Sequence, residues 1–181
     1  MRASSLYEAV LGGQYAQLAP AVQTFHRMTG RVTLHGEVET EPPASRAARW
    51  LAWCIRTPRT PTRGPIRFTL DAAATEETWT RHFPRHTMRS TLFLHQERIM
   101  ERLGAVRLVF ALEAEHGVLR MRLEGLRFLG IPCPAWLRPT VLAEETGSGE
   151  RIHFNVRARV PLLGVVAAYR GYLDLTTMQS A

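Results

Sequence analysis

The sequence predicts an α+β domain that is mainly antiparallel β, with a curled or barrel-like sheet of about nine strands and two or three N-terminal helices covering an end or an edge. From residue 65 onward, apolar and polar residues alternate with a period of two, as in strands with one buried face. Turn residues separate these short runs with few helices between them, which favours antiparallel pairing. A sheet with one apolar face must pack as a sandwich or curl until it closes, and we favour the barrel.

The N-terminal region, about residues 4–58, is expected to be largely helical. Ser4 or Ser5 is placed to cap a first helix in SLYEAVLG, with Glu8 completing a capping box. Pro20 suits the first turn of a second helix, in PAVQTFHRMTG. Between the helices, the stretch RVTLHGEVE alternates and predicts a strand.

The β region, about residues 65–175, is expected to supply most of the sheet. The runs that predict its strands are 66–71, 77–83, 87–95, 98–103, 106–113, 119–124, 140–145, 152–160 and 165–175. The proline-rich stretch GIPCPAWLRP, residues 130–139, is expected to be a stiff connection at the rim of a cavity. No internal repeat or glycine-rich nucleotide-binding fingerprint interrupts this order, so residues 1–181 are expected to form a single domain.

The composition is that of an ordinary globular protein, with 45% hydrophobic and 22% charged residues. No apolar run is long enough for a membrane-spanning helix, and the N-terminus lacks the continuous apolar core of a secretory signal. We therefore expect a cytoplasmic protein.

The net charge is +7, and every basic residue apart from histidine is an arginine. The lack of lysine excludes Schiff-base chemistry, a pyridoxal-phosphate lysine and a phosphate-binding P-loop, and we expect no cofactor. A basic balance favours an acidic partner, an anionic lipid or nucleic acid. Because the arginines are spread along the chain rather than clustered in an arm, nucleic acid is not expected as a partner.

Metal and thiol chemistry are not expected either. The seven histidines follow no metal-ligand spacing. Cys54 and Cys133 are far apart and lack redox spacing, so two free thiols are expected, and the prolines beside Cys133 give it no activating base.

Arg81, in the stretch TWTRHF, is the first candidate site residue. In a strand it shares a face with Trp79 and Phe83, so a permanent charge points where two aromatic side chains point. A buried guanidinium needs acceptors. They would come from Glu144 or Glu145, one of which faces inward, or from the carboxylate or phosphate of a ligand; otherwise Arg81 lies in an exposed rim.

The C-terminal run PLLGVVAAYRGYLDL offers a second candidate. Tyr169 and Gly171 share a face with Val165, and small residues beside an inward tyrosine would leave room for a ligand against the strand. The alternative is that Gly171 marks a bulge and Tyr169 bonds a neighbour. His26, on a helix face with Val22, is either a satisfied core histidine or a general base.

The helix expected over residues 44–55 carries Trp50 and Trp53 among arginines. It is either a lid or packing helix on the β domain, or a helix that lies in a membrane interface. Both interpretations place the two tryptophans against apolar material, so contact with a membrane surface is a possible partner interaction.

Several short motifs in this order have the pattern of a known family. They are His26…Gly30, His35-Gly36, Trp79-x-Arg81-x-Phe83, Gly130-x-Pro132-x-Pro134, Pro139, Glu144 or Glu145, Phe154-x-Val156, Pro161-Leu162-Leu163-Gly164 and Tyr169-Arg170-Gly171. The combination resembles the bacterial family known as domain of unknown function 4166, over roughly residues 5–175. Members occur alone or after a saccharopine-dehydrogenase-like nucleotide-binding domain, which implies a small-molecule or lipid-linked pathway. The resemblance raises Arg81 as a site residue and assigns no catalytic one.

The leading hypothesis is a small-molecule-binding module whose interior accepts a hydrophobic ligand, with or without an acidic group. Arg81 would hold the polar end of the ligand, and Glu144 or Glu145 would orient Arg81. One alternative is an isomerase-like or cyclase-like enzyme that uses Glu145, His26 or Tyr169 as a proton donor or acceptor. Another is a non-catalytic partner domain for a nucleotide-dependent reductase. The sequence alone does not decide whether the protein is an enzyme.

Overall fold

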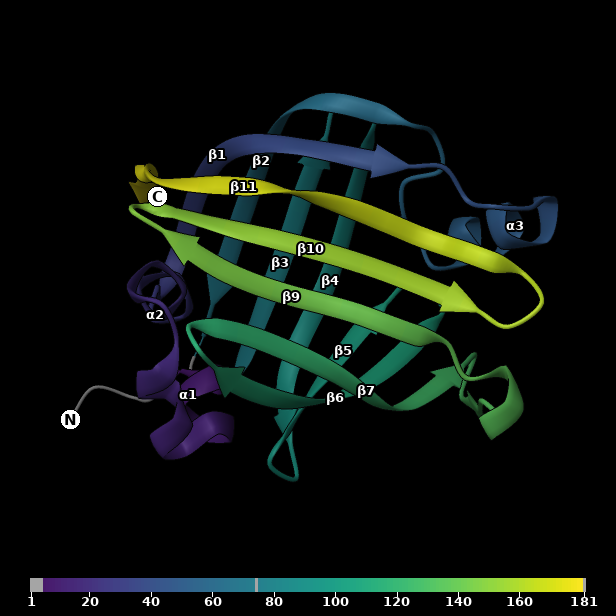
Figure 1. Cartoon of the computed structure of the whole chain (residues 1–181), viewed down its shortest axis with the longest axis horizontal. Helices are drawn as coiled ribbons and strands as arrows, with labels where there is room; N and C mark the ends of the chain where they lie inside the picture. The colour runs from purple at the N-terminus through teal and green to yellow at the C-terminus, as the bar shows by residue number, and fades with distance from the viewer. Residues whose placement is uncertain (1–4, 74, 181) are drawn as a thin grey trace.

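The computed structural model describes residues 5–73 and 75–180, and it is a closed antiparallel β-barrel (Figure 1). Its strands follow the order β6-β5-β4-β3-β2-β1-β11-β10-β9-β7, and pairing of β6 with β7 closes the cylinder. A short additional strand, β8, pairs only with β7 among the described residues. The expected α+β class with a barrel-like antiparallel sheet is confirmed.

The strands correspond closely to the alternating runs of the sequence. They are β1 Gly30–Glu41, β2 Thr62–Ala72, β3 Glu76–Phe83, β4 His86–His95, β5 Arg98–Leu103, β6 Val106–Glu115, β7 Val118–Phe128, β8 Ile131–Pro132, β9 Thr140–Ser148, β10 Arg151–Val160 and β11 Gly164–Ser180. The described sheet thus has 11 strands rather than about nine. One of them, β8, lies in the proline-rich segment expected to be only a connection.

The helices are short and lie at the two ends of the barrel. They are α1 Leu6–Leu11, η1 Gly12–Gln17, α2 Pro20–His26, α3 Arg46–Cys54 and η2 Ala135–Leu137. Ser5 caps α1 in a capping box with Glu8, as expected; Ser4 lies outside the described residues. Proline begins α2, where its missing N–H and fixed φ are tolerated.

The two ends of the barrel differ. Figure 1 shows α1 and α2 at the end on the left, and α3 at the opposite end, beside the turn between β10 and β11. The expectation that the helices cover one end therefore holds for α1 and α2, whereas α3 belongs to the other end. We call the end with α1 and α2 the helical end, and the end with α3 the α3 end.

Alternation sets the inside of the barrel, but register shifts interrupt the pairings of β1 with β11, of β10 with β11 and of β6 with β7. The pairing of β10 with β11 shifts register between Ala158 and Arg159, so inward positions change parity along β11. Val166 is buried near the start of the strand, whereas Ala167 and Tyr169 face inward beyond the shift. The expectation that Val165 shares the face of Tyr169 was wrong, because a bulge reverses faces on its two sides.

No helix in the described part of the chain has both the length and the apolar composition needed to cross a bilayer.

Candidate functional site

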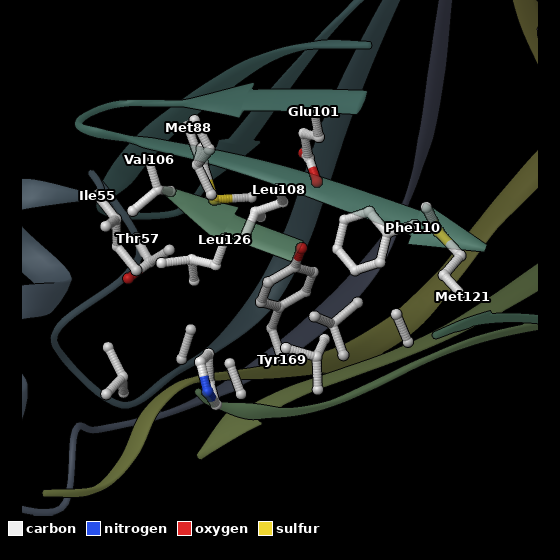
Figure 2. Close-up of a pocket in the computed structure, with 18 of the residues that line it drawn as sticks. Ile55, Thr57, Met88, Glu101, Val106, Leu108, Phe110, Met121, Leu126 and Tyr169 are labelled. Carbon is white, nitrogen blue, oxygen red and sulfur yellow. The ribbon is translucent and has the colours of Figure 1, made fainter. Parts of the chain in front are cut away.

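A cavity of about 580 Å³ occupies the interior of the barrel (Figure 2). Its wall is mostly aliphatic and aromatic, with a few polar residues: Thr57, Arg81, Glu101, Glu144, Glu145 and Tyr169. This size and lining are typical of sites that enclose small organic molecules, in which a few polar groups fix the orientation of an otherwise apolar ligand.

Strand β3 places Arg81 in this cavity. Glu77, Trp79, Arg81 and Phe83 are all buried, and the residues between them are more exposed. Period-two alternation therefore identified the inward face of TWTRHF. Trp79 and Arg81 line the cavity, whereas the Phe83 ring packs edge-on against Tyr169.

Arg81 is only 9% exposed, and its guanidinium lacks a carboxylate partner among the described residues. Its Nη1 donates a hydrogen bond to Ser90 Oγ at 3.1 Å. The guanidinium carbon lies 5.0 Å from the centre of the Trp79 ring and 5.9 Å from that of Phe68. Aromatic faces attract the cation without using its N–H donors, so most of the five donors of Arg81 stay available in the cavity.

The expected pairing of Arg81 with Glu144 or Glu145 is not what the structure contains. Glu144 accepts a hydrogen bond from Arg120 Nε at 2.9 Å, at the partly exposed surface. Glu145 is the inward one of the two, but its Oε2 lies 2.6 Å from His26 Nε2. The prediction that one of these carboxylates faces inward was sound; the partner was wrong because α2 brings a histidine to that point of β9.

His26 is a buried neighbour of the cavity rather than part of its lining. It is 2% exposed, and its ring stacks on Tyr7 with centroids 3.7 Å apart. Its Nδ1 and the Tyr7 hydroxyl are buried without a hydrogen-bond partner among the described residues. His26 therefore reaches the cavity only through Glu145, which lines it.

Glu101 is a polar lining residue that the sequence analysis missed. In β5 it lies between the inward residues Ile99 and Leu103, the same pattern that identified Arg81. Figure 2 shows the carboxyl group of Glu101 and the hydroxyl of Tyr169 both directed into the cavity. Burial raises the pKa of Tyr169, the charge of Arg81 opposes that rise, and the nearby Glu101 adds to it. The hydroxyl is therefore a neutral donor and acceptor at physiological pH.

A further carboxyl group lies below Arg81 on β3. Glu77 accepts a hydrogen bond from Trp79 Nε1 at 2.9 Å, and burial raises its pKa above the usual value for glutamate. Burial also raises the pKa of Tyr7 well above its usual value. Burial thus favours the neutral forms of Glu77 and Tyr7, whereas Arg81 carries a permanent charge in the wall of the cavity.

Gly171 has a structural role that differs from the expected one. A Cβ on this residue would lie 2.1 Å from the backbone oxygen of Glu37 in β1. The space beside Gly171 is therefore filled by the neighbouring strand, and the glycine allows β1 and β11 to approach closely. Tyr169, two residues earlier, does line the cavity.

The described residues contain no group of three or more His, Cys, Asp or Glu side chains arranged to hold a metal ion. Cys54 and Cys133 are free thiols, and Cys133 lines the cavity near the α3 end.

Fold and site together define a closed antiparallel β-barrel with an apolar interior cavity and a buried arginine in its wall. The chain belongs to the family described as domain of unknown function (DUF4166), whose model matches residues 18–173. The crystal structure of Rv2717c from M. tuberculosis is similar at a TM-score of 0.48 and 12% sequence identity, covering 87% of this chain and 98% of that one. A search of curated protein sequences finds no significant match.

Proposed function

We propose that the barrel is a small-molecule-binding module for an apolar molecule that carries an acidic group. The observation that carries this proposal is the buried Arg81 guanidinium, which faces an apolar cavity and has Ser90 as its hydrogen-bond partner. A buried cation without a carboxylate partner lowers the stability of the free protein. A bound carboxylate would offset this loss by accepting charge-assisted hydrogen bonds.

The rest of the cavity supports an amphipathic ligand. Arg81, Glu101 and Tyr169 come from three different strands and supply polar groups to the lining, with Arg81 and Glu101 close enough to act on the Tyr169 hydroxyl. Toward the α3 end the lining becomes apolar, with residues such as Leu126, Val141 and Leu163. A ligand would therefore enter with its acidic group first and leave its apolar part nearer the α3 end.

The proposal predicts opposite effects of Arg81→Met on stability and on binding. Methionine removes a buried charge, so the melting temperature of the free protein should stay the same or rise. The affinity for dodecanoate should fall by at least about tenfold, because a hydrogen-bonded charge pair is worth roughly 1.5–3 kcal/mol. Binding of dodecanol, which has no charge, should change little.

Thermal shifts and calorimetric titrations with a panel of fatty acids and aromatic acids measure both effects. Arg89→Met is the matched control, because Arg89 lies on the exposed side of the neighbouring strand β4 and should leave affinity unchanged. Equal affinities of wild type and Arg81→Met for every acid would remove Arg81 from the site. An absence of saturable binding by any acid would reject the proposal.

A second candidate, an enzyme acting on such a ligand, is favoured by the contact between Glu145 and His26. A carboxylate that lines a cavity and is held 2.6 Å from a buried histidine has the arrangement of a general base with a supporting partner. If this candidate is correct, wild type converts a bound acid to an isomer and Glu145→Gln does not, as measured by mass spectrometry and NMR of extracted ligand. Recovery of unchanged ligand from both proteins supports binding alone.

A further inference from the structure

The α3 end of the barrel carries an unusual set of exposed apolar side chains. Trp50 and Trp53 of α3 are 59% and 60% exposed, because the helix packs against Val160 and Val166 through Ala48 and Ala52 instead. The expectation that both tryptophans lie against apolar material is therefore met only in part within this chain, by Trp50 where it lines the cavity. The exposed apolar residues at this end are Trp50, Trp53, Leu129, Ile131, Trp136 and Leu162.

The charged residues in the connections at this end all have one sign, and Glu41, the last residue of β1, is already paired with Arg157. The connections between strands there span residues 42–61, 84–85, 104–105, 129–139 and 161–163, all within the described chain. They contain no aspartate or glutamate. Their charged residues are Arg46, Arg49, Arg56, Arg59, Arg85 and Arg138, all exposed and without an ion pair in the described chain. We call these arginines and the exposed apolar residues together the rim.

The helical end provides the contrast. Glu8, Glu97 and Glu150 lie in or beside its connections, and Arg27 there pairs with Glu8 at 2.7 Å. The net charge of +7 is thus distributed unevenly along the barrel axis, with unpaired positive charge around the α3 end.

We propose that the rim docks on the surface of an anionic lipid bilayer. Tryptophan side chains and basic residues on one face are the combination that holds proteins at the interface between headgroups and acyl chains. Clustered arginines without acidic neighbours are attracted to anionic headgroups, and their guanidinium groups stay in the headgroup layer while the apolar side chains enter it. The exposed tryptophans lie both on α3 and on the β7–β9 connection, so two separate segments would contact the bilayer.

Docking in this orientation would place the mouth of the cavity against the membrane. Trp50 and Ile131 are largely exposed and also line the cavity, so its apolar wall continues to the surface between them. An apolar acid could then pass between bilayer and cavity without crossing water. The docking itself goes beyond the proposed function and does not require that the cavity hold a ligand.

The test is flotation of the full chain with vesicles of phosphatidylcholine alone or phosphatidylcholine mixed with phosphatidylglycerol. Wild type should bind the mixed vesicles, bind phosphatidylcholine weakly, and lose binding as salt is raised. Arg46→Glu/Arg49→Glu should reduce the partition coefficient by at least about tenfold, because each basic residue near an anionic surface adds substantially to the free energy of membrane binding. Arg31→Glu/Arg89→Glu changes the net charge equally away from the rim, and it should reduce the partition coefficient much less.

Tryptophan fluorescence gives a second readout. Trp50→Phe/Trp53→Phe retains aromatic bulk but should lose most of the emission shift and of the quenching by brominated lipid that wild type shows with mixed vesicles. An equal loss of binding in the two double arginine variants would mean that net charge alone attracts the protein to the vesicles. That result would overturn the proposal that the rim docks on the bilayer. The proposal would also be overturned if the wild-type protein formed a dimer that buries the tryptophans and did not bind vesicles. Tight binding of RNA without binding of vesicles would overturn it as well. Arg81→Met should bind vesicles like wild type, so failure of the cavity proposal and failure of docking are distinguishable.

Discussion

Gly171→Ala should lower the free energy of unfolding by at least about 3 kcal/mol, since overpacking against rigid backbone exceeds the usual cost of an added methyl group. The new Cβ would lie 2.1 Å from the Glu37 carbonyl oxygen and 2.9 Å from the Val38 Cα. Both are backbone atoms, so the steric clash can be relieved only if β1 moves away from β11. These strands are neighbours in the closed barrel, and separating them disturbs hydrogen bonds on either side.

Gly125→Ala is the matched control, because Gly125 is also a strand glycine, in β7. A Cβ there would meet only the Val109 side chain, at 3.6 and 3.7 Å, which is ordinary contact. Stability should stay the same or rise by about 0.4–1 kcal/mol, since alanine restricts the unfolded chain. Chemical denaturation of both variants measures the difference. Equal stabilities would mean that β1 and β11 are farther apart than described, and would restore Gly171 as a place for a ligand.

Phe110→Ala should lower the free energy of unfolding by roughly 3–5 kcal/mol, the usual range for a fully buried phenylalanine. Phe110 is 3% exposed and sits on β6 opposite Ile99. Truncation removes packing that the surrounding strands, fixed in a closed barrel, cannot replace by collapsing.

Phe154→Ala should cost about half as much, roughly 1–3 kcal/mol, although the sequence pattern alone predicts the same loss for both residues. Both rings line the cavity, but Phe154 is only half-buried, whereas Phe110 is almost fully buried. Phe154 therefore has fewer packing neighbours to lose. Urea denaturation of the two variants tests this, and a loss at Phe154 equal to or greater than that at Phe110 would contradict the difference in burial between the two rings.

Much of the barrel was predictable because one physical signal repeats along the chain. In an antiparallel strand that faces an apolar interior on one side and water on the other, buried and more exposed residues must alternate. Strand β3 follows that rule from Glu77 to Phe83. The rule failed in β11, where a bulge between Val165 and Ala167 reverses the faces. A single extra residue leaves no mark in the sequence that distinguishes it from regular alternation.

The partners within the site were less predictable than its position. His26 and Glu145 are 119 residues apart, and only the docking of α2 against β9 brings them to 2.6 Å. Glu101 could have been found, because it lies between the apolar residues Ile99 and Leu103 just as Arg81 lies between aromatic ones. The exposure of Trp50 and Trp53 could not have been predicted. Large apolar side chains usually face the core, whereas α3 packs through its alanines.

The proposed binding function depends most on contact between an acidic group of the ligand and Arg81 inside the barrel. The most direct measurement is the pKa of the carboxyl group of bound dodecanoate, labelled with carbon-13 at that carbon and followed by NMR as the pH is lowered. Burial in an apolar cavity alone raises this pKa, whereas an adjacent guanidinium lowers it. We predict a bound pKa below that of dodecanoate in water for wild type, and above it for Arg81→Met. The same pKa in both proteins would contradict the account.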